Sequence, residues 1–129
     1  MQNWFSKFKL LINLIKYRGI FFKKQYSKNG EDQYLKRIFK NKKKGIYLDV
    51  GAYHPYRASN TCLLYKKGWS GINVDISKES IDLFNIARPN DINLNIAIGD
   101  KNKVQTFYYK KQRHPMNTLN KEFAENYFY

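Results

Sequence analysis

The chain has 129 residues, a formal net charge of +14 and a hydrophobic fraction of 43%. This length fits one domain with a modest core, and an aromatic fraction of 17% with seven glycines and three prolines excludes a disordered or collagen-like chain. The single cysteine, Cys62, excludes an intramolecular disulfide and a cysteine-based zinc site. It predicts a free, buried thiol in a reducing compartment.

The positive charge is concentrated at the start of the chain. Residues 1–44 carry 13 basic and 2 acidic side chains, whereas residues 45–129 carry 11 and 8. Such an excess favours nucleic acid or an anionic membrane as a partner, although an A/T-rich genome produces the same lysine and asparagine bias. Residues 107–111 come closest to interleaving aromatic and basic side chains, but no nucleic-acid-binding motif is present. Nucleic acid is therefore not the expected partner.

The first segment has the spacing of an amphipathic helix over residues 2–17. At about 100° per residue, its large apolar side chains lie within an arc of about 120° around the helix axis, while the lysines lie outside that arc. The apolar residues of the arc are Trp4, Phe5, Phe8, Leu11, Ile12 and Ile15. Two interpretations remain open: residues 2–24 lie on an anionic membrane surface, helped by Lys16, Arg18, Lys23 and Lys24, or the apolar face packs on the domain or a partner.

No apolar run approaches the roughly 20 residues that cross a bilayer, and no signal-peptide cleavage site follows the first helix. We therefore expect a cytoplasmic location, with the inner face of the membrane as the alternative.

The next segment predicts a helix that ends in the basic run Lys40–Lys44, followed by a strand. Asn29 is the expected N-cap, acidic residues occupy the first turn, and Gly45 follows the basic end. The buried stripe of this helix is expected to be Tyr34, Leu35, Ile38 and Phe39. Residues 46–50 form a short apolar run between glycines and predict a buried strand.

Two further helices alternate with strands over residues 59–98. Ser59 is the expected cap of a helix over 60–67, and Ser77 caps a helix that ends at Arg88, before Pro89. Strands are expected over 71–75 and 92–98, and polar alternation in the latter predicts an edge strand. Alternating strands and helices predict the α/β class with a parallel sheet in the order 3-2-1. A turn at 99–102 and a further strand over 104–109 complete the expectation.

Ligands of such sheets bind beyond the carboxyl ends of the strands, where the first strand ends at Gly51. Tyr53 and His54 replace the further glycines that a dinucleotide pyrophosphate needs, so NAD and FAD are disfavoured. A nucleoside without a pyrophosphate, such as S-adenosyl-L-methionine, requires only the first glycine. Asp75, at the tip of the second strand and 26 residues after Asp49, is placed to accept hydrogen bonds from two ribose hydroxyls.

The sequence around these residues resembles the FkbM family of S-adenosylmethionine-dependent methyltransferases. The resemblance extends from residue 27 to about residue 125 and rests on four blocks: SKNGEDQYL (27–35), YLDVGAYHPYRASNTCLLYKKGWSGINVDIS (47–77), ARPNDINLNIAIGD (87–100) and TFYYKKQRHPMNTL (106–119). It implies a Rossmann-like fold, in which the chain forms the first half of the parallel sheet of a class I methyltransferase. Residues 27–129 would form this partial domain, and residues 1–26 a basic amphipathic segment outside it.

The resemblance also implies the cofactor site and the reaction. Asp49, Gly51 and Ala52 would belong to the first cofactor motif, Asp75 would bind the ribose, Ile76 would contact the adenine, and Gly99 and Asp100 would form a corner at the adenine edge. The implied reaction is O-methylation of a sugar, glycan or secondary-metabolite hydroxyl. The alternative is a catalytically inactive membrane-surface or basic binding protein built on a degenerate methyltransferase half.

No catalytic residue or metal ligand is assigned. His54 and His114 both precede prolines in predicted loops, and a structural role is the favoured interpretation of each. Because family members continue beyond the equivalent of residue 129, the chain is expected to be a truncated product, a split reading frame or a fragment with little or no activity of its own. We therefore expect self-association, or a partner chain that supplies the remaining strands.

Overall fold

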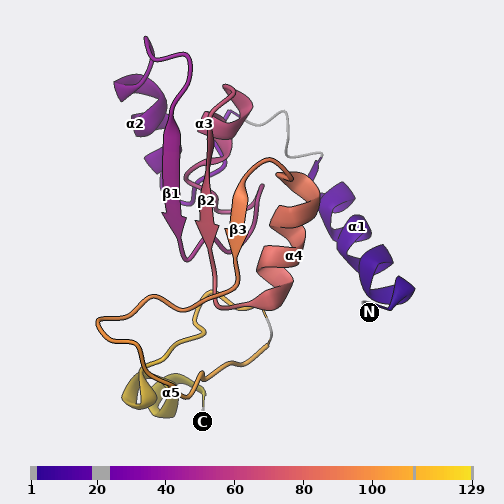
Figure 1. Cartoon of the computed structure of the whole chain (residues 1–129), viewed down its shortest axis with the longest axis vertical. Helices are drawn as coiled ribbons and strands as arrows, with labels where there is room; N and C mark the ends of the chain where they lie inside the picture. Colours follow the sequence, from indigo (N-terminus) through magenta and orange to yellow (C-terminus); the bar gives the residue numbers. More distant parts are fainter. Residues whose placement is uncertain (1–2, 19–23, 112, 129) are drawn as a thin grey trace.

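The computed structural model describes residues 3–18, 24–111 and 113–128 (Figure 1). The chain has a mixed α/β fold with one three-stranded parallel sheet in the order β1-β2-β3. Its elements are α1 (Trp4–Arg18), α2 (Glu31–Ile38), β1 (Ile46–Val50), α3 (Cys62–Lys66), β2 (Ser70–Val74), α4 (Lys78–Ala87), β3 (Ile92–Leu94) and α5 (Lys121–Phe128).

The sheet confirms the predicted order, parallel pairing and edge position of the third strand. In the register, Leu48 lies beside Ile72, which in turn lies beside Ile92. The predicted extension of the third strand to residue 98 is wrong, because β3 ends at Leu94. There the side-chain amide of Asn95 donates to the carbonyl oxygens of Asp75 and Ile76, at 3.0 and 2.8 Å, in place of a continued backbone ladder.

Helix α2 differs from its prediction at the cap and in the buried stripe. Its N-cap is Gly30, with φ 92°, and not Asn29. Tyr34 and Ile38 face solvent, so half of the expected stripe is wrong. The other half, Leu35 and Phe39, packs against a core cluster of three buried residues, namely Tyr47, Leu64 and Trp69.

Helix α4 has the cap that the sequence predicts, whereas α3 does not. Ser77 caps α4 as predicted, and its Oγ accepts from the Ser80 backbone N–H at 3.4 Å. The prediction that Ser59 caps the preceding helix is wrong, because α3 begins three residues later, after Thr61. The Ser59 hydroxyl instead accepts from Nη2 of Arg88 at 3.1 Å.

In the described part of the chain, helices cover one face of the sheet. Arg88, at the end of α4, contacts Tyr47 of β1 and the Tyr65 ring of α3, which places both crossover helices on the Tyr47 side. Much of the opposite face is exposed among the described residues, with Ile46 and Leu48 exposed by 80% and 64%, although Val74 at the carboxyl end of β2 is buried. The prediction that residues 46–50 form a buried strand is therefore wrong for the open face, whereas Tyr47 on the covered face is buried and the strand conformation is confirmed.

Helix α1 lies outside α4, on the side away from α2 (Figure 1). Its buried Leu10 and Leu14 pack against Leu83 of α4. The predicted helix is confirmed from residue 4, whereas Gln2 and Lys23 of the predicted segment lie outside the described residues. No helix in the described part of the chain is long and apolar enough to cross a membrane.

After β3 the chain passes below the carboxyl ends of the strands and returns toward them (Figure 1). The predicted strand over 104–109 is wrong: the described residues form one isolated antiparallel bridge, between Tyr108 and Thr118. Both backbone hydrogen bonds of this bridge are present, at 2.9 and 3.0 Å. The bridge holds residues 107–111 and 113–119 back over the end of the sheet.

Candidate functional site

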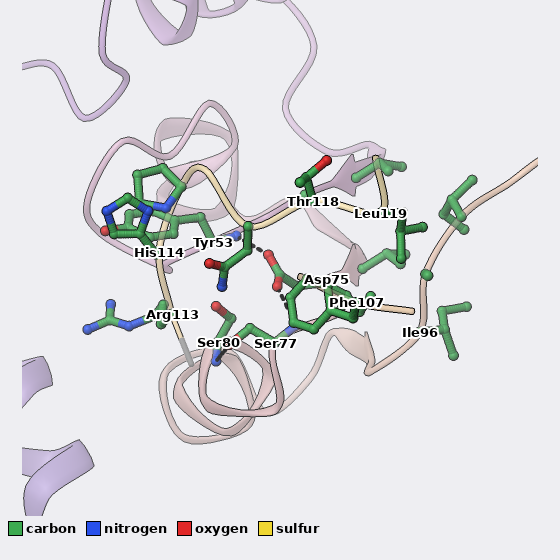
Figure 2. Close-up of a pocket in the computed structure, with 18 residues that line it drawn as sticks. Tyr53, Asp75, Ser77, Ser80, Ile96, Phe107, Arg113, His114, Thr118 and Leu119 are labelled. Atoms are coloured by element: carbon green, nitrogen blue, oxygen red, sulfur yellow. Dashed lines mark hydrogen bonds between the residues drawn. The ribbon is translucent and has the colours of Figure 1, made fainter. Parts of the chain in front are cut away.

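A pocket of about 300 Å³ lies at the carboxyl ends of the strands. Its walls come from the ends of β1 and β2, the start of α4, the segment after β3 and the folded-back segment 107–119 (Figure 2). The residues lining it are Val50, Gly51, Tyr53, Val74, Asp75, Ile76, Ser77, Ser80, Ile96, Ala97, Ile98, Phe107, Arg113, His114, Pro115, Asn117, Thr118 and Leu119.

Gly51 turns the chain sharply at the end of β1. Its backbone N–H and that of Ala52 both donate to the carbonyl oxygen of Val74, at 2.9 and 3.1 Å, which ties the turn to β2. Gly51 has φ 71°, a conformation that favours glycine, while a Cβ added there would meet no atom within 4 Å. Backbone conformation, rather than lack of space, therefore selects glycine here.

Asp75 is the acidic group of the pocket, held in place at both carboxylate oxygens. Oδ2 accepts from the Tyr53 backbone N–H and Oδ1 from the Ser77 backbone N–H, each at 2.8 Å (Figure 2). A carboxylate has about four acceptor sites, so each oxygen can accept one further hydrogen bond from a ligand. The side chain is thus both oriented by the backbone and available to donors in the pocket.

The rest of the pocket wall contains both apolar side chains and a polar hydroxyl. Ile76, Ile98 and Phe107 provide apolar surface. Ser80 is fully buried, and its Oγ has no hydrogen-bond partner among the described residues. A buried hydroxyl without a partner is costly, so this Oγ is an unused hydrogen-bonding group in the wall of the pocket.

The guanidinium of Arg113 lies over the Tyr53 ring, 5.6 Å from its centroid. Its Nε is 3.7 Å from Oε1 of Glu79, so the folded-back segment is joined to both the loop after β1 and α4.

Three of the seven predicted cofactor residues line the pocket: Gly51, Asp75 and Ile76. Gly99 and Asp100 are exposed and lie beyond its rim, although the neighbouring Ile98 reaches it. Ala52 is buried beside the pocket without lining it.

Asp49 does not line the pocket, because alternation along β1 turns it toward the helix-covered face. There its Oδ2 accepts from Oγ1 of Thr61 at 2.6 Å. Burial raises the pKa of this carboxyl, against the lowering effects of the Thr61 hydrogen bond and the Arg88 charge. Asp49 therefore anchors the start of α3 to the sheet.

The two histidines have different surroundings. His54 is fully buried and does not line the pocket. Its Nδ1 accepts from the backbone N–H groups of Tyr56 and Arg57, at 2.9 and 3.0 Å, and Nε2 therefore donates to Oδ1 of Asn13 at 3.0 Å. Burial, assisted by the positive charges of Arg113 and Arg57, lowers the pKa of His54 to about 3. The structural role favoured from the sequence fits these contacts.

His114 is in the pocket wall, with its Nδ1 accepting from the Met116 backbone N–H at 3.2 Å. Sequence reasoning gave no site role to His114 or to Ser80, Phe107 and Arg113. The one available signal was that block 106–119 shares in the family resemblance, but no local pattern indicated that this segment folds back.

No family model matches the chain, and neither curated proteins nor solved structures include a match. Within residues 3–18, 24–111 and 113–128, no group of three or more His, Cys, Asp or Glu side chains is arranged to hold a metal ion.

Proposed function

We propose that the pocket binds S-adenosyl-L-methionine and that the chain is a class I methyltransferase domain of the FkbM type, acting on a hydroxyl of a sugar, glycan or secondary metabolite. The observation that carries the proposal is the oriented Asp75 carboxylate at the tip of β2, in one pocket with the Gly51 turn. This is the position where α/β sheets bind the ribose of a nucleoside ligand.

The groups of the pocket fit this cofactor. The two remaining acceptor sites of Asp75 suit two ribose hydroxyls, and Ile76 and Ile98 offer apolar surface to the adenine. The unpartnered Ser80 Oγ supplies one more hydrogen-bonding group. A cavity of about 300 Å³ lies at the small end of ligand pockets, which favours a single nucleoside over a dinucleotide.

The bound cofactor would supply the methyl group that passes to the acceptor oxygen. The protein's part is chiefly alignment: Asp75 would fix the ribose, while Phe107 and residues 113–119 form one wall of the pocket. His114 Nδ1 accepts the Met116 N–H, so its Nε2 carries the ring proton and can donate a hydrogen bond to a bound ligand, and no general base is assigned.

Calorimetric titration with S-adenosylmethionine tests the proposal, with NAD as the comparison ligand. Asp75→Ala should weaken binding by about 2 to 4 kcal/mol, since two hydrogen bonds to a charged acceptor are lost. Asp100→Ala is the matched control, because it removes an exposed carboxylate outside the pocket and should leave affinity unchanged. Equal affinity of the wild type and Asp75→Ala for the cofactor would refute the site.

A second candidate function, a catalytically inactive membrane-surface protein, is favoured by the exposed apolar side chains of α1. The two functions differ in whether the pocket binds the cofactor, so the same titration separates them. Absence of cofactor binding together with membrane attachment would support the second.

A further inference from the structure

Helix α1 is attached to the domain through one face only. Leu10 and Leu14 are buried against Leu83. Between them, the Asn13 side chain accepts the hydrogen bond from the buried His54, and the Tyr17 ring packs edge-on against the His54 ring at 5.0 Å. These contacts fix which side of α1 faces inward and therefore which side faces out.

The opposite side of α1 carries a continuous apolar surface, which we call the outer stripe. Its members are exposed by 45% to 72%. They are Trp4, Phe5, Phe8, Leu11, Ile12 and Ile15. At about 100° per residue, the middle of this stripe lies roughly opposite the middle of the inward face. Of the interpretations left open for these six side chains, packing on the rest of the domain is wrong for the described residues.

Lysines border the outer stripe on both sides. Lys7 lies along one edge, and Lys9 and Lys16 lie along the other, at the helical spacing of about 100° per residue. All three are exposed, and residues 1–30 contain no Asp or Glu. Long lysine side chains beside apolar surface can extend their ammonium groups toward anionic headgroups while the apolar side chains enter the interface.

We propose that the outer stripe docks α1 in the plane of a membrane interface that contains anionic lipids. A 15-residue helix is about 22 Å long, too short to cross a bilayer but well suited to lie along it. A second copy of α1 would bring lysine borders against lysine borders, whereas an anionic surface matches them. The attachment of α1 to α4 would hold the whole domain at the lipid surface, independently of what the pocket binds.

Co-sedimentation of the full chain with lipid vesicles tests this proposal. We expect binding to phosphatidylcholine vesicles that contain phosphatidylglycerol, weakened by salt, and little binding to phosphatidylcholine alone. The double variant Phe5→Ser with Ile12→Ser should lose at least about tenfold in partitioning. Lys9→Gln with Lys16→Gln should lose roughly 30-fold on anionic vesicles, since two charges near the surface are removed.

The matched control removes exposed apolar side chains elsewhere. Ile46→Ser with Leu48→Ser takes a similar amount of apolar surface from the open face of the sheet and should leave vesicle binding unchanged. Because all four replaced apolar side chains are exposed, circular dichroism should show an intact fold in both double variants. Greater loss in this control than in the outer-stripe variant would overturn the proposal.

Tryptophan fluorescence gives a second readout. Trp4 is on the outer stripe, whereas Trp69 is buried, so vesicles should shift the emission of Trp4 to shorter wavelength. Trp4→Phe should abolish this shift while sedimentation with vesicles persists. The proposal would be overturned by a chain that binds no vesicle of either composition, or that binds an RNA oligonucleotide in preference to anionic vesicles.

Discussion

The two faces of the sheet are built from opposite kinds of side chain. The face beneath the helices is largely polar and carries Tyr47, Asp49, Gly71, Asn73 and Asn93, whereas the open face carries Ile46, Leu48, Val50, Ile72, Ile92 and Leu94. Parallel sheets normally have both faces covered by helices. The difference shows that the packing described for this chain is organised around a polar network, while its most apolar sheet surface is in contact with water.

The covered face is specified by directional contacts. Asp91 accepts hydrogen bonds from the Tyr47 hydroxyl, the Gly71 backbone N–H and the Asn73 side-chain amide. Burial raises the pKa of the Tyr47 phenol, so this hydroxyl keeps its proton and can donate. A buried polar network tolerates little change, because removing one member leaves its partners unsatisfied.

The largest effect is expected at Arg88, which joins the covered face to the loop after β1. Its guanidinium donates to Oγ1 of Thr61 at 2.9 Å, the Pro55 carbonyl oxygen at 2.6 Å and Oγ of Ser59 at 3.1 Å. Arg88→Met should lower the free energy of unfolding by about 3 to 5 kcal/mol in urea titrations. The same change at exposed Arg37 should cost less than about 0.5 kcal/mol, and equal effects would contradict the comparison.

The next largest effect tests how closely the covered face is packed. A Cβ at Gly71 would overlap the Tyr47 ring and approach its backbone carbonyl oxygen at 2.5 Å. Gly71→Ala should therefore destabilise the chain by about 3 kcal/mol, at the upper end for overpacking. Gly99→Ala is the control, because its Cβ would meet nothing closer than 4.0 Å. An unchanged midpoint of thermal unfolding in Gly71→Ala would show that the covered face is not closely packed at this position.

His54 predicts how stability depends on pH. Its pKa in the folded chain is about 3, below its ordinary value of 6.5, so the unfolded chain binds more protons between these values. Stability is therefore retained above about pH 6.5 and falls as the pH decreases, by about 2 kcal/mol at pH 5. Urea unfolding at both pH values should show this loss in the wild type and a much smaller one in His54→Gln. Parallel losses in the two proteins would contradict it.

The smallest effect on folding is expected on the open face. Ile46→Thr with Leu48→Thr should change the free energy of unfolding by less than about 1 kcal/mol, because both side chains are exposed. The same variant should reduce self-association and the binding of a hydrophobic dye, since a large exposed apolar patch promotes both. Sedimentation velocity measures the self-association. An unchanged distribution of species would contradict the prediction that the open face promotes it.

The sequence predicts the order of strands and helices well because it depends on local patterns. The apolar run of β1, the Ser77 cap and the Gly51 turn each require only neighbouring residues. Which face of an element is covered depends on the rest of the chain. For this reason α1 packs through Leu10 and Leu14, whereas the wider outer stripe predicted as its main apolar face stays exposed.

The site was predictable in part for the same reason. Asp75 and Gly51 follow strands directly, so the carboxyl-end rule places them together. The carboxyl-end rule does not place Asp49 in the pocket. Successive side chains of a strand point to opposite faces of the sheet, and that of Asp49 points to the face covered by helices. Ser80 and His114 reach the pocket through a helix start and a folded-back segment, and no spacing in the sequence indicates either contact.

The most direct test of the proposed site is a crystal structure of the chain with S-adenosylhomocysteine, the product form of the cofactor. We predict that both ribose hydroxyls lie within hydrogen-bond distance of the Asp75 carboxylate and that the adenine lies against Ile76 and Ile98. Nucleoside bound away from Asp75, or a pocket without nucleoside at saturating concentration, would contradict the account.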